Sequence, residues 1–335
     1  METEFRYIRI LEFWKVRLIA GLNIEMNVYI PIFDSQEHEV ERLVKYININ
    51  FPEGHVIFLA PISYIEKVNL DKYGECIDED TLYDQLNIEN VKKIIKERIG
   101  KDGRAGWYFQ QFLKMSICVF EKNDFYVVWD SDTIPLRPVS FFDESGYPIF
   151  IGKREYHKPY FDTLYKLFCP PVIRTIKEIS FISEVMIIKT SIMKNLICSI
   201  NNECISPGKD FFEKIIHSIS ESELNECGFS EFETYGNYTT SRYPNEYKIK
   251  KFKTLRTAAE IVGGDPSQKQ LEWLSKDFEF ISLERSARPY LRFLTKNKII
   301  INNFKAISVV RLFNRIKNKL KKILNKRGLI EYDWL

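Results

Sequence analysis

DFYVVWDSDTIPLRP (residues 124–138) places a run of strand-forming residues directly before two aspartates that are separated by one serine. Phe, Tyr, Val and Trp favour strands, and a short apolar run of this kind fits a strand buried on both faces of a sheet. In open α/β sheets, ligands gather beyond the carboxyl ends of the strands. The stretch therefore predicts a buried strand that ends at a candidate ligand site.

The tripeptide Asp130-Ser131-Asp132 allows two interpretations. Two carboxylates one residue apart can both reach a Mg²⁺ or Mn²⁺ ion that keeps water and phosphate oxygens among its ligands. Alternatively, the tripeptide caps a polar turn, because Asp and Ser accept backbone hydrogen bonds well. Since D-x-D arises by accident in many chains, the tripeptide alone favours the turn.

The surrounding sequence predicts alternating strands and helices. An apolar run at 27–33, a helix with Val40, Leu43, Val44 and Ile47 at helical spacing, and a second run at 55–61 indicate a parallel βαβ unit. Farther along, we expect helical character at 79–100, a helix from Trp107, a strand at 147–153, a strand at Val185–Lys189 followed by a helix, and a helix at 208–220. The segment 228–244 is too rich in Gly and Tyr to be predicted as plain helix.

Composition indicates an ordinary globular chain. It has 335 residues, of which 45% are hydrophobic and 28% charged, enough for one large domain or two ordinary ones. We find neither a run of eighteen apolar residues nor a signal-peptide core. The six cysteines include no C-x-x-C pair, which argues against a zinc site and a disulfide scaffold. We expect a cytoplasmic protein with reduced thiols.

The positive charge belongs to one segment. The net charge is +3, but residues 305–327 carry nine Lys or Arg and no Asp or Glu, so that removing those nine leaves −6. Val309, Phe313, Ile316 and further apolar residues recur there at intervals of three and four, which predicts a basic amphipathic helix. Such a helix can lie on an anionic membrane surface or dock its apolar stripe on the protein core. Nucleic acid is not expected as a partner, because the rest of the chain is acidic.

Three sequence blocks resemble a known family. They are GWYFQQFLKMSICVFEKNDFYVVWDSDTIPLRPVSFFD (106–143), SFISEVMIIKT (180–190) and FSEFETYGNY (229–238). In this order they resemble a bacterial family of glycosyltransferase-like proteins, a domain of unknown function related to the GT-A nucleotide-sugar transferases. The resemblance implies a GT-A-like, Rossmann-type αβα sandwich, with a mostly parallel central sheet and a C-terminal helical extension. It also implies that Asp130 and Asp132 hold Mn²⁺ or Mg²⁺ against the donor diphosphate, with Asp132 the preferred direct ligand.

The order of the expected elements suggests three segments, and the resemblance has one departure. We expect an N-terminal extension at 1–26, a catalytic domain at 27–260, and a C-terminal extension at 261–335 with the basic helix near 305–327. At ISEVM the resemblance leads us to expect histidine, whereas the chain has Glu184. A downstream histidine ligand for the metal is therefore in doubt.

Further residues are candidates for the chemistry of sugar transfer. Glu231, which is preferred, or Glu233 could take the proton of an acceptor hydroxyl; alternatively, both merely hydrogen-bond a loop. Aromatic rings stack on sugars and amides bond hydroxyls, which makes Tyr235, Asn237 and Tyr238 candidates for the acceptor pocket. The remaining candidates are Asp34, Gln110, Gln111, Lys114 and Lys153 for the donor, His157 and Glu184 for the acceptor, and Arg154 for either.

The sequence thus predicts a metal-dependent glycosyltransferase. It would move a sugar from a nucleotide-sugar donor to a surface glycan such as capsule or lipopolysaccharide, free or lipid-linked, at the inner face of the cell membrane. A Mg²⁺-dependent nucleotidyltransferase or phosphohydrolase would use the same acidic pair. A third alternative is a non-catalytic, membrane-docked glycan-binding module.

Overall fold

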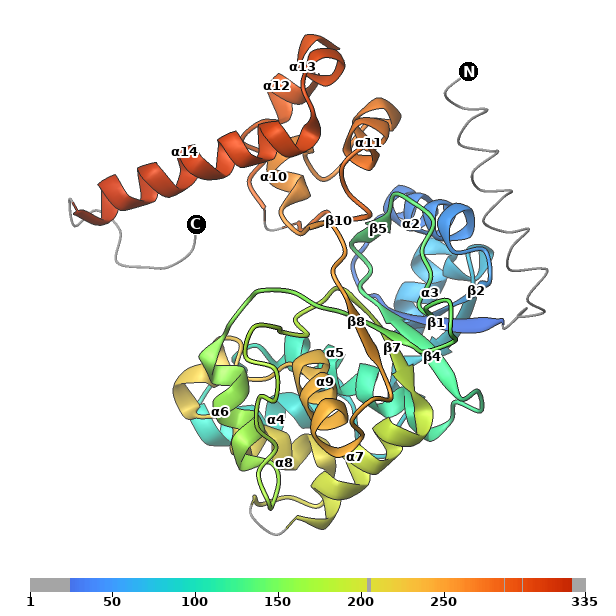
Figure 1. The fold of residues 1–335 in the computed structure, drawn as a ribbon. Coiled ribbons are helices and arrows are strands. Elements are labelled where there is room, and N and C mark those ends of the chain that lie inside the picture. The colour runs from blue at the N-terminus through green and yellow to red at the C-terminus, as the bar shows by residue number, and fades with distance from the viewer. Residues whose placement is uncertain (1–24, 204–205, 286, 297, 327–335) are drawn as a thin grey trace. The chain divides into compact units, whose positions relative to one another are not determined.

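The computed structural model describes residues 25–203, 206–285, 287–296 and 298–326 (Figure 1). The chain divides into two compact units. The first contains residues 25–133 and Val139–Lys251, and the second contains Ile134–Pro138 and the chain from Phe252 onward. Nearly all of the expected extension at 1–26 lies outside the described residues. The expected boundary of a catalytic domain at residue 260 stays a prediction.

A five-stranded sheet is the centre of the first unit. Its order is β3-β2-β1-β4-β7, and all neighbours are parallel except β4 and β7, which are antiparallel. The prediction of an α/β fold with a mostly parallel central sheet is confirmed. The bounds are β1 Met26–Pro31, β2 Gly54–Ala60, β3 Glu75–Asp78, β4 Phe125–Trp129 and β7 Val185–Lys189.

The first βαβ unit forms as the apolar spacing predicts. Helix α2 (Glu37–Asn50) buries Val40, Leu43, Val44 and Ile47, the four residues that recur at helical intervals. At its start the backbone N–H of Gln36 donates to a carboxylate oxygen of Glu39 at 2.7 Å, which satisfies a donor at a helix end. The helix returns the chain so that β2 lies parallel to β1, with Val28 level with Val56.

The strand order creates a switch point between β1 and β4. From β1 the chain builds β2 and then β3 on one side, and later crosses to place β4 on the other side. Because β1 and β4 are parallel, with Val28 level with Val127, their carboxyl ends open at the same edge. This is where open α/β sheets bind ligands, and it is where the chain continues from β4 into Asp130.

The remaining elements of the first unit surround this sheet (Figure 1). Helix α5 is buried from Gln111 to Ser116. The segment expected to be helical at 79–100 forms a short 3-10 helix at Glu79–Thr81 and an α-helix from Ile88. Of the strand expected at 147–153, only Ile149–Ile151 form a strand, β6, which pairs with β8 in a separate sheet. The bounds are α3 Ile62–Val68, α4 Ile88–Ile99, α5 Ala105–Ser116, β6 Ile149–Ile151, α6 Lys158–Lys166, α7 Thr190–Asn202, α8 Phe211–Ser218, α9 Glu231–Arg242 and β8 Lys248–Lys250.

The segment 228–244 contains a regular helix, so the prediction that it is not plain helix was wrong. Helix α9 begins after Ser230, whose side chain accepts the backbone N–H of Glu233. At Gly236 an added Cβ would lie 2.2 Å from a ring atom of Phe181. The glycine therefore allows the close approach of a neighbouring segment, and packing outweighs its low helix propensity.

The second unit contains a small sheet and five helices within the described residues. The sheet order is β5-β10-β9, and the guanidinium of Arg137 donates to the backbone carbonyls of Ser275 and Lys276 at the end of α11. No helix in the described part of the chain is long and apolar enough to cross a membrane. The bounds are β5 Thr133–Pro135, β9 Thr254–Leu255, α10 Ala258–Val262, α11 Gln268–Ser275, β10 Phe280–Ser282, α12 Arg292–Lys296, α13 Lys298–Asn303 and α14 Ala306–Lys326; α14 confirms the helix expected near 305–327.

We predict that Gly236→Ala destabilises the protein although alanine favours helix. The new Cβ would force Phe181 to move, and overpacking of this kind costs about 1–3 kcal/mol. Urea unfolding would measure the free-energy change. Gly106→Ala in α5 is the matched control, because a Cβ there meets nothing within 4 Å, and we expect it to be neutral or slightly stabilising. Equal stabilities of the two variants would contradict the packing role of Gly236.

Candidate active site

A buried lysine joins two carboxylates at the end of β4. Lys114 projects from α5, and its Nζ lies 2.5 Å from Oδ1 of Asp130 and 2.9 Å from Oε1 of Glu231. The lysine side chain is only 7% exposed, and Nζ lies 4.7 Å from the ring centroid of Phe232. Lys114 and Asp130 come from the first of the three sequence blocks and Glu231 comes from the third, so the fold brings these two blocks together around one ammonium group.

The carboxylates determine the charge state of this cluster. Burial alone would lower the pKa of Lys114, but the charges of Asp130 and Glu231 outweigh burial and hold that pKa above its ordinary value. Burial raises the pKa of Glu231, and the Lys114 ammonium opposes this rise. With both carboxylates ionised, the three groups carry one excess negative charge at the sheet edge. Such an excess favours an approaching cation.

Gln111 extends the cluster along the buried face of α5. Its side-chain oxygen accepts the backbone N–H of Glu231 at 3.5 Å, at the start of α9. Gln111 is buried and Gln110, one residue earlier, is half-buried. The expected donor contacts of both glutamines stay predictions. In the structure, Gln111 holds the backbone of Glu231 in place through this hydrogen bond.

A second buried ion pair lies beside Asp130. The backbone N–H of Asp130 donates to the carbonyl of Glu184 at 2.9 Å, just before β7 begins. The Glu184 carboxylate accepts from Nζ of Lys153 at 2.9 and 3.1 Å, and both side chains are buried. The predicted donor role of Lys153 and acceptor role of Glu184 stay predictions. The observed pairing gives each residue a structural partner instead.

Two further aspartates follow strands β4 and β1 at this edge of the sheet. Asp132 is half-buried, and one of its oxygens accepts the Thr133 hydroxyl at 3.2 Å. Asp34 is exposed and follows the end of β1. In the described part of the chain, no three His, Cys, Asp or Glu side chains are grouped so that they could hold a metal ion. A divalent cation at Asp130 and Asp132 would therefore need oxygens from water or a bound phosphate, a mixture typical of Mg²⁺ sites.

The Glu233 carboxylate forms hydrogen bonds within the protein. One carboxylate oxygen accepts the backbone N–H of Phe181 at 2.8 Å, and the other accepts the side-chain N–H of Asn237 at 2.9 Å. The side chain is buried, and burial raises its pKa to about 6. The first oxygen holds the segment that leads to Glu184 and β7, and the second bonds within α9. This geometry favours the loop-bonding interpretation of Glu233 over general base catalysis.

Three of the expected acceptor residues have partners within the fold. The hydroxyl of Tyr235 lies 2.7 Å from that of Tyr247 and accepts the backbone N–H of Lys189 at 2.9 Å. The hydroxyl of Tyr238 lies 3.0 Å from that of Ser199. A ring nitrogen of His157 lies 2.7 Å from the carbonyl oxygen of Cys227.

Burial decides how well these residues suit an acceptor pocket. Tyr235, Asn237 and Tyr238 are all buried, whereas His157 is half-buried and Arg154 is exposed. A fully buried ring has no free face on which a sugar could stack. The assignment of Tyr235 and Asn237 to an acceptor pocket stays a prediction that this packing does not favour.

Sequence reasoning missed two features of the site. It placed Lys114 against the donor but did not foresee its ion pairs, although a lysine within the apolar run FLKMSICVF signals a buried charge that needs partners. It also passed over Glu79, which follows β3 at the same sheet edge. Burial raises the pKa of Glu79 to about 8, and only the fold shows that this side chain is buried.

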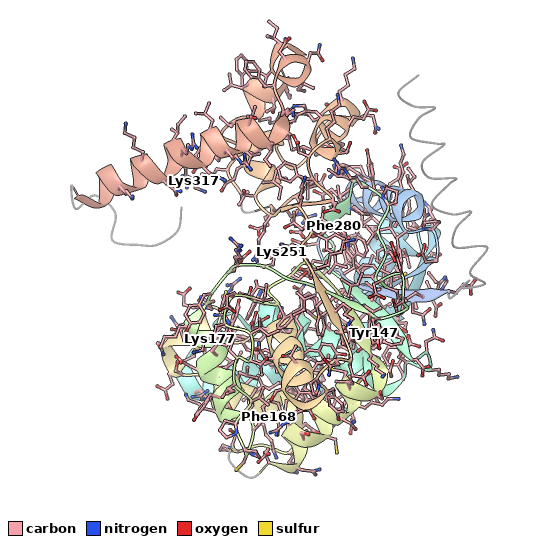
Figure 2. All side chains as sticks on the ribbon, in the orientation of Figure 1. Tyr147, Phe168, Lys177, Lys251, Phe280 and Lys317 are labelled. Carbon is pink, nitrogen blue, oxygen red and sulfur yellow. The ribbon has the colours of Figure 1, made fainter. Side chains whose placement is uncertain are left out.

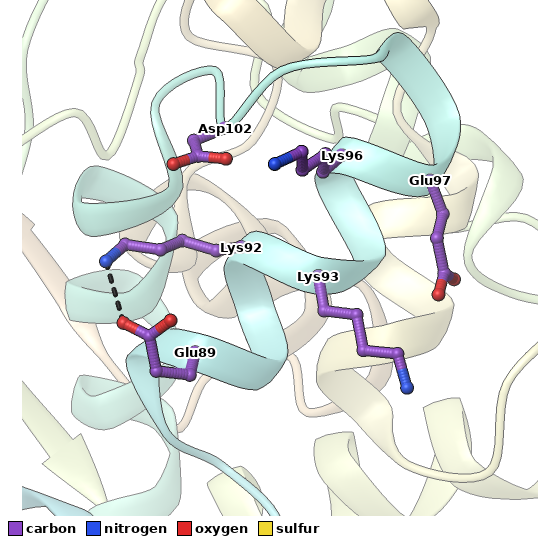
Figure 3. Close-up of a pocket in the computed structure, with 6 residues that line it drawn as sticks. All are labelled: Glu89, Lys92, Lys93, Lys96, Glu97 and Asp102. Carbon is purple, nitrogen blue, oxygen red and sulfur yellow. Dashed lines mark hydrogen bonds and ion pairs between the residues drawn. The ribbon is translucent and has the colours of Figure 1, made fainter.

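A surface depression over α4 lies outside this site. Figure 3 shows its lining, in which Nζ of Lys92 lies 2.8 Å from a carboxylate oxygen of Glu89. None of the residues that line it belongs to the cluster around Lys114. The lining residues are Glu89, Lys92, Lys93, Lys96, Glu97 and Asp102.

Comparisons with known proteins give structural neighbours. No family model matches the chain, and no curated protein matches its sequence. PaToxG glycosyltransferase has 12% identity and a TM-score of 0.38 over 71% of this chain and 80% of its own. GlyE, a glycosyltransferase of Streptococcus pneumoniae TIGR4, has 12% identity and a TM-score of 0.39 over 87% of this chain and 63% of its own. An active-site mutant of LgtC has 9% identity and a TM-score of 0.41 over 81% of this chain and 94% of its own.

We predict that Lys114→Met destabilises the protein strongly. It would leave the Glu231 carboxylate buried without its partner, and breaking a buried ion pair on one side costs about 3–5 kcal/mol. Urea unfolding would measure the loss, and adding Glu231→Gln should recover part of it. Lys92→Met is the matched control, because Lys92 forms an exposed pair with Glu89 that should be worth about 0–1 kcal/mol. Equal losses for the two methionine variants would contradict the central role of Lys114.

We predict that Glu233 makes folding less favourable as pH rises. Its folded pKa of about 6 lies above the ordinary 4.5. The protonated Glu233 side chain therefore stabilises the folded protein fully below pH 4.5, and this stabilisation is lost as pH rises through 6. Between pH 4.5 and 7 the loss should be about 1.5 kcal/mol. Glu233→Gln should remove this part of the pH dependence in urea unfolding at the two pH values, and an unchanged dependence would show that Glu233 does not titrate in this range.

Proposed function

We propose that the protein is a metal-dependent glycosyltransferase that uses a nucleotide-sugar donor. The observation that carries the proposal is the position of Asp130, at the carboxyl end of β4 beside the switch point, where α/β sheets bind ligands. The first and third of the blocks that resemble nucleotide-sugar transferases supply Lys114, Asp130 and Glu231, and Lys114 contacts both carboxylates. The motif and the tertiary contacts thus favour the same edge of the sheet.

The proposed donor site combines a cation with acidic side chains. Asp130 and Asp132 would hold Mn²⁺ or Mg²⁺, with Asp132 the preferred direct ligand, as the family resemblance implies. Both side chains are half-buried, and one oxygen of Asp130 contacts Lys114. When bound, the cation would neutralise the charge of the nucleotide diphosphate that leaves the sugar. Asp34 follows the neighbouring strand β1, and we propose that it contacts the nucleoside part of the donor.

Glu231 has two possible roles in this reaction. A general base must come within hydrogen-bonding distance of the acceptor hydroxyl, whereas Glu231 is buried and bound to Lys114. We propose that Glu231 positions Lys114, and through it Asp130, in the resting protein. Its expected role as the base would require the acceptor to reach a carboxylate that the fold covers.

For the acceptor we propose a surface glycan, such as capsule or lipopolysaccharide, free or linked to lipid. The proposal rests on the family resemblance. The inner face of the cell membrane would be the place of transfer, since lipid-linked glycans are presented there to enzymes of the cytoplasm.

We predict that a nucleotide sugar together with Mn²⁺ raises the melting temperature of the protein. A ligand that binds only the folded state stabilises it by about 2.7 kcal/mol at a hundred times its dissociation constant. Thermal unfolding with a panel of nucleotide sugars, with and without Mn²⁺, would detect this shift. Asp132→Asn should abolish the metal-dependent part, whereas Asp71→Asn, at an exposed residue, should leave the shift unchanged. A panel that shifts nothing with metal present would remove the donor-site proposal.

Turnover distinguishes the proposed transferase from other enzymes with an acidic pair. We expect wild-type protein to release nucleoside diphosphate from one nucleotide sugar, and Asp130→Asn to do so at least about 100-fold more slowly, the order of loss typical when electrostatic stabilisation of a reaction is removed. Hydrolysis of the diphosphate linkage, which releases nucleoside monophosphate and sugar phosphate, would instead indicate a phosphohydrolase. Release of pyrophosphate from a nucleoside triphosphate supplied together with a sugar phosphate would indicate a nucleotidyltransferase.

A further inference from the structure

Helix α14 has more apolar surface than the second unit covers. Ala306 and Val310 are buried. Leu312 and Ile316, one turn apart, remain 59% and 51% exposed. At roughly 100° per residue, this second pair lies about 120° around the helix from the buried pair. One face of the helix therefore docks on the core of the second unit, and a different apolar face stays exposed.

The cations of α14 also fall into two groups, one that pairs with the second unit and one that stays exposed. Nζ of Lys317 lies 2.7 Å from the Glu260 carboxylate, so this lysine holds the helix to α10 (Figure 2). The exposed pair Leu312 and Ile316 is bordered instead by a row of exposed cations on the next face of the helix. These are Arg311, Arg315, Lys319 and Lys322.

The chain around α14 is also basic and also exposes apolar side chains. Residues 285–330 contain fourteen Lys or Arg and no Asp or Glu, so that subtracting them from the net charge of +3 leaves −11 for the remainder. Phe293 of α12 is 86% exposed, and the ring centroid of Tyr290 lies 6.1 Å from that of Phe313 on α14. The aromatic and apolar surface thus continues beyond the helix.

We propose that the exposed face of α14, formed by Leu312, Ile316, Arg311, Arg315, Lys319 and Lys322, docks on an anionic phospholipid surface. An amphipathic helix lies in the plane of the interface, with its apolar residues at the boundary of headgroups and acyl chains. The flanking cations then lie among anionic headgroups, where each is worth about 1 kcal/mol. The proposal concerns the second unit and does not depend on the catalytic proposal.

The exposed surface fits lipid better than nucleic acid. A polyphosphate would use the cations but leave Leu312 and Ile316 in water, because nucleic-acid affinity comes mainly from contacts with phosphate. The acidic remainder of the chain would also repel it. A lipid surface buries the apolar pair and neutralises the cations at once.

Vesicle sedimentation of the full chain tests the proposal. Vesicles of phosphatidylcholine with about 30% phosphatidylglycerol should bind the protein, and vesicles of phosphatidylcholine alone should bind it far less, because cations are attracted to anionic headgroups. Raising the salt from about 0.1 M to about 0.5 M should weaken binding, since the Debye length shortens. Absence of binding to the anionic vesicles at low salt would overturn the proposal.

Two sets of variants separate the charged and apolar parts. Replacing Arg315, Lys319 and Lys322 by Gln should weaken vesicle binding on the order of 100-fold, at about fivefold for each cation. Leu312→Ser with Ile316→Ser should weaken it about tenfold, because binding scales with the apolar area that is buried. Circular dichroism would confirm that the variants keep their helix content and melting temperature.

Matched controls come from the first unit. Lys93, Lys96 and Lys101 are exposed and control for loss of three cations when they are replaced by Gln. Ile62 and Tyr165 are exposed apolar residues and control for the serine pair. Binding that falls equally in the controls, or that survives in both α14 variants, would overturn the proposal. So would binding to heparin or RNA with none to vesicles.

One more variant keeps this proposal separate from the catalytic one. Asp132→Asn should bind anionic vesicles as tightly as wild type, because the substitution lies in the first unit and leaves α14 intact. Loss of vesicle binding in the α14 variants with an unchanged nucleotide-sugar shift would support two independent sites.

Discussion

The ammonium of Lys114 is the interaction on which the candidate site depends. It lies in the interior within 3 Å of both Asp130 and Glu231, and neither the ammonium nor the buried Glu231 carboxylate would be tolerated there alone, because desolvating an isolated ion costs several kcal/mol. The lysine fixes α5, the end of β4 and the start of α9 relative to one another. Lys114 thereby engages one oxygen of Asp130, and the Thr133 hydroxyl engages one oxygen of Asp132.

The sheet gives this interaction its position. β4 pairs with β1 in parallel and with β7 in antiparallel register, so the carboxyl end of β4 meets the beginning of β7 at one edge. Glu233 and the Lys153–Glu184 pair hold the chain that enters β7. Several buried charges thus serve to shape the edge, at which Asp132 is half-buried and Asp34 is exposed. A rigid frame with accessible groups on it suits a binding site.

Much of the fold follows from local sequence. The run FYVVW predicts a buried strand, and the spacing of Val40, Leu43, Val44 and Ile47 predicts the helix that packs on the sheet. Helix α9 was missed because Gly236 lowers helix propensity. A glycine stands at this position because Phe181, a residue 55 positions away, packs directly against it. The Lys114–Glu231 pair was missed for a related reason, since a partner separated by 117 residues leaves no local pattern.

By itself, the sequence determined the α/β class, the strand before Asp130 and the basic amphipathic helix, because these follow from periodicity and composition over short windows. Only the tertiary structure decided which carboxylates are buried and paired, and which cations of α14 stay exposed. Lys153 is not distinguishable from a surface lysine by its local sequence, and Lys317 looks like its neighbours until it pairs with Glu260. Burial and pairing are relations between distant parts of the chain, and folding alone brings those parts into contact.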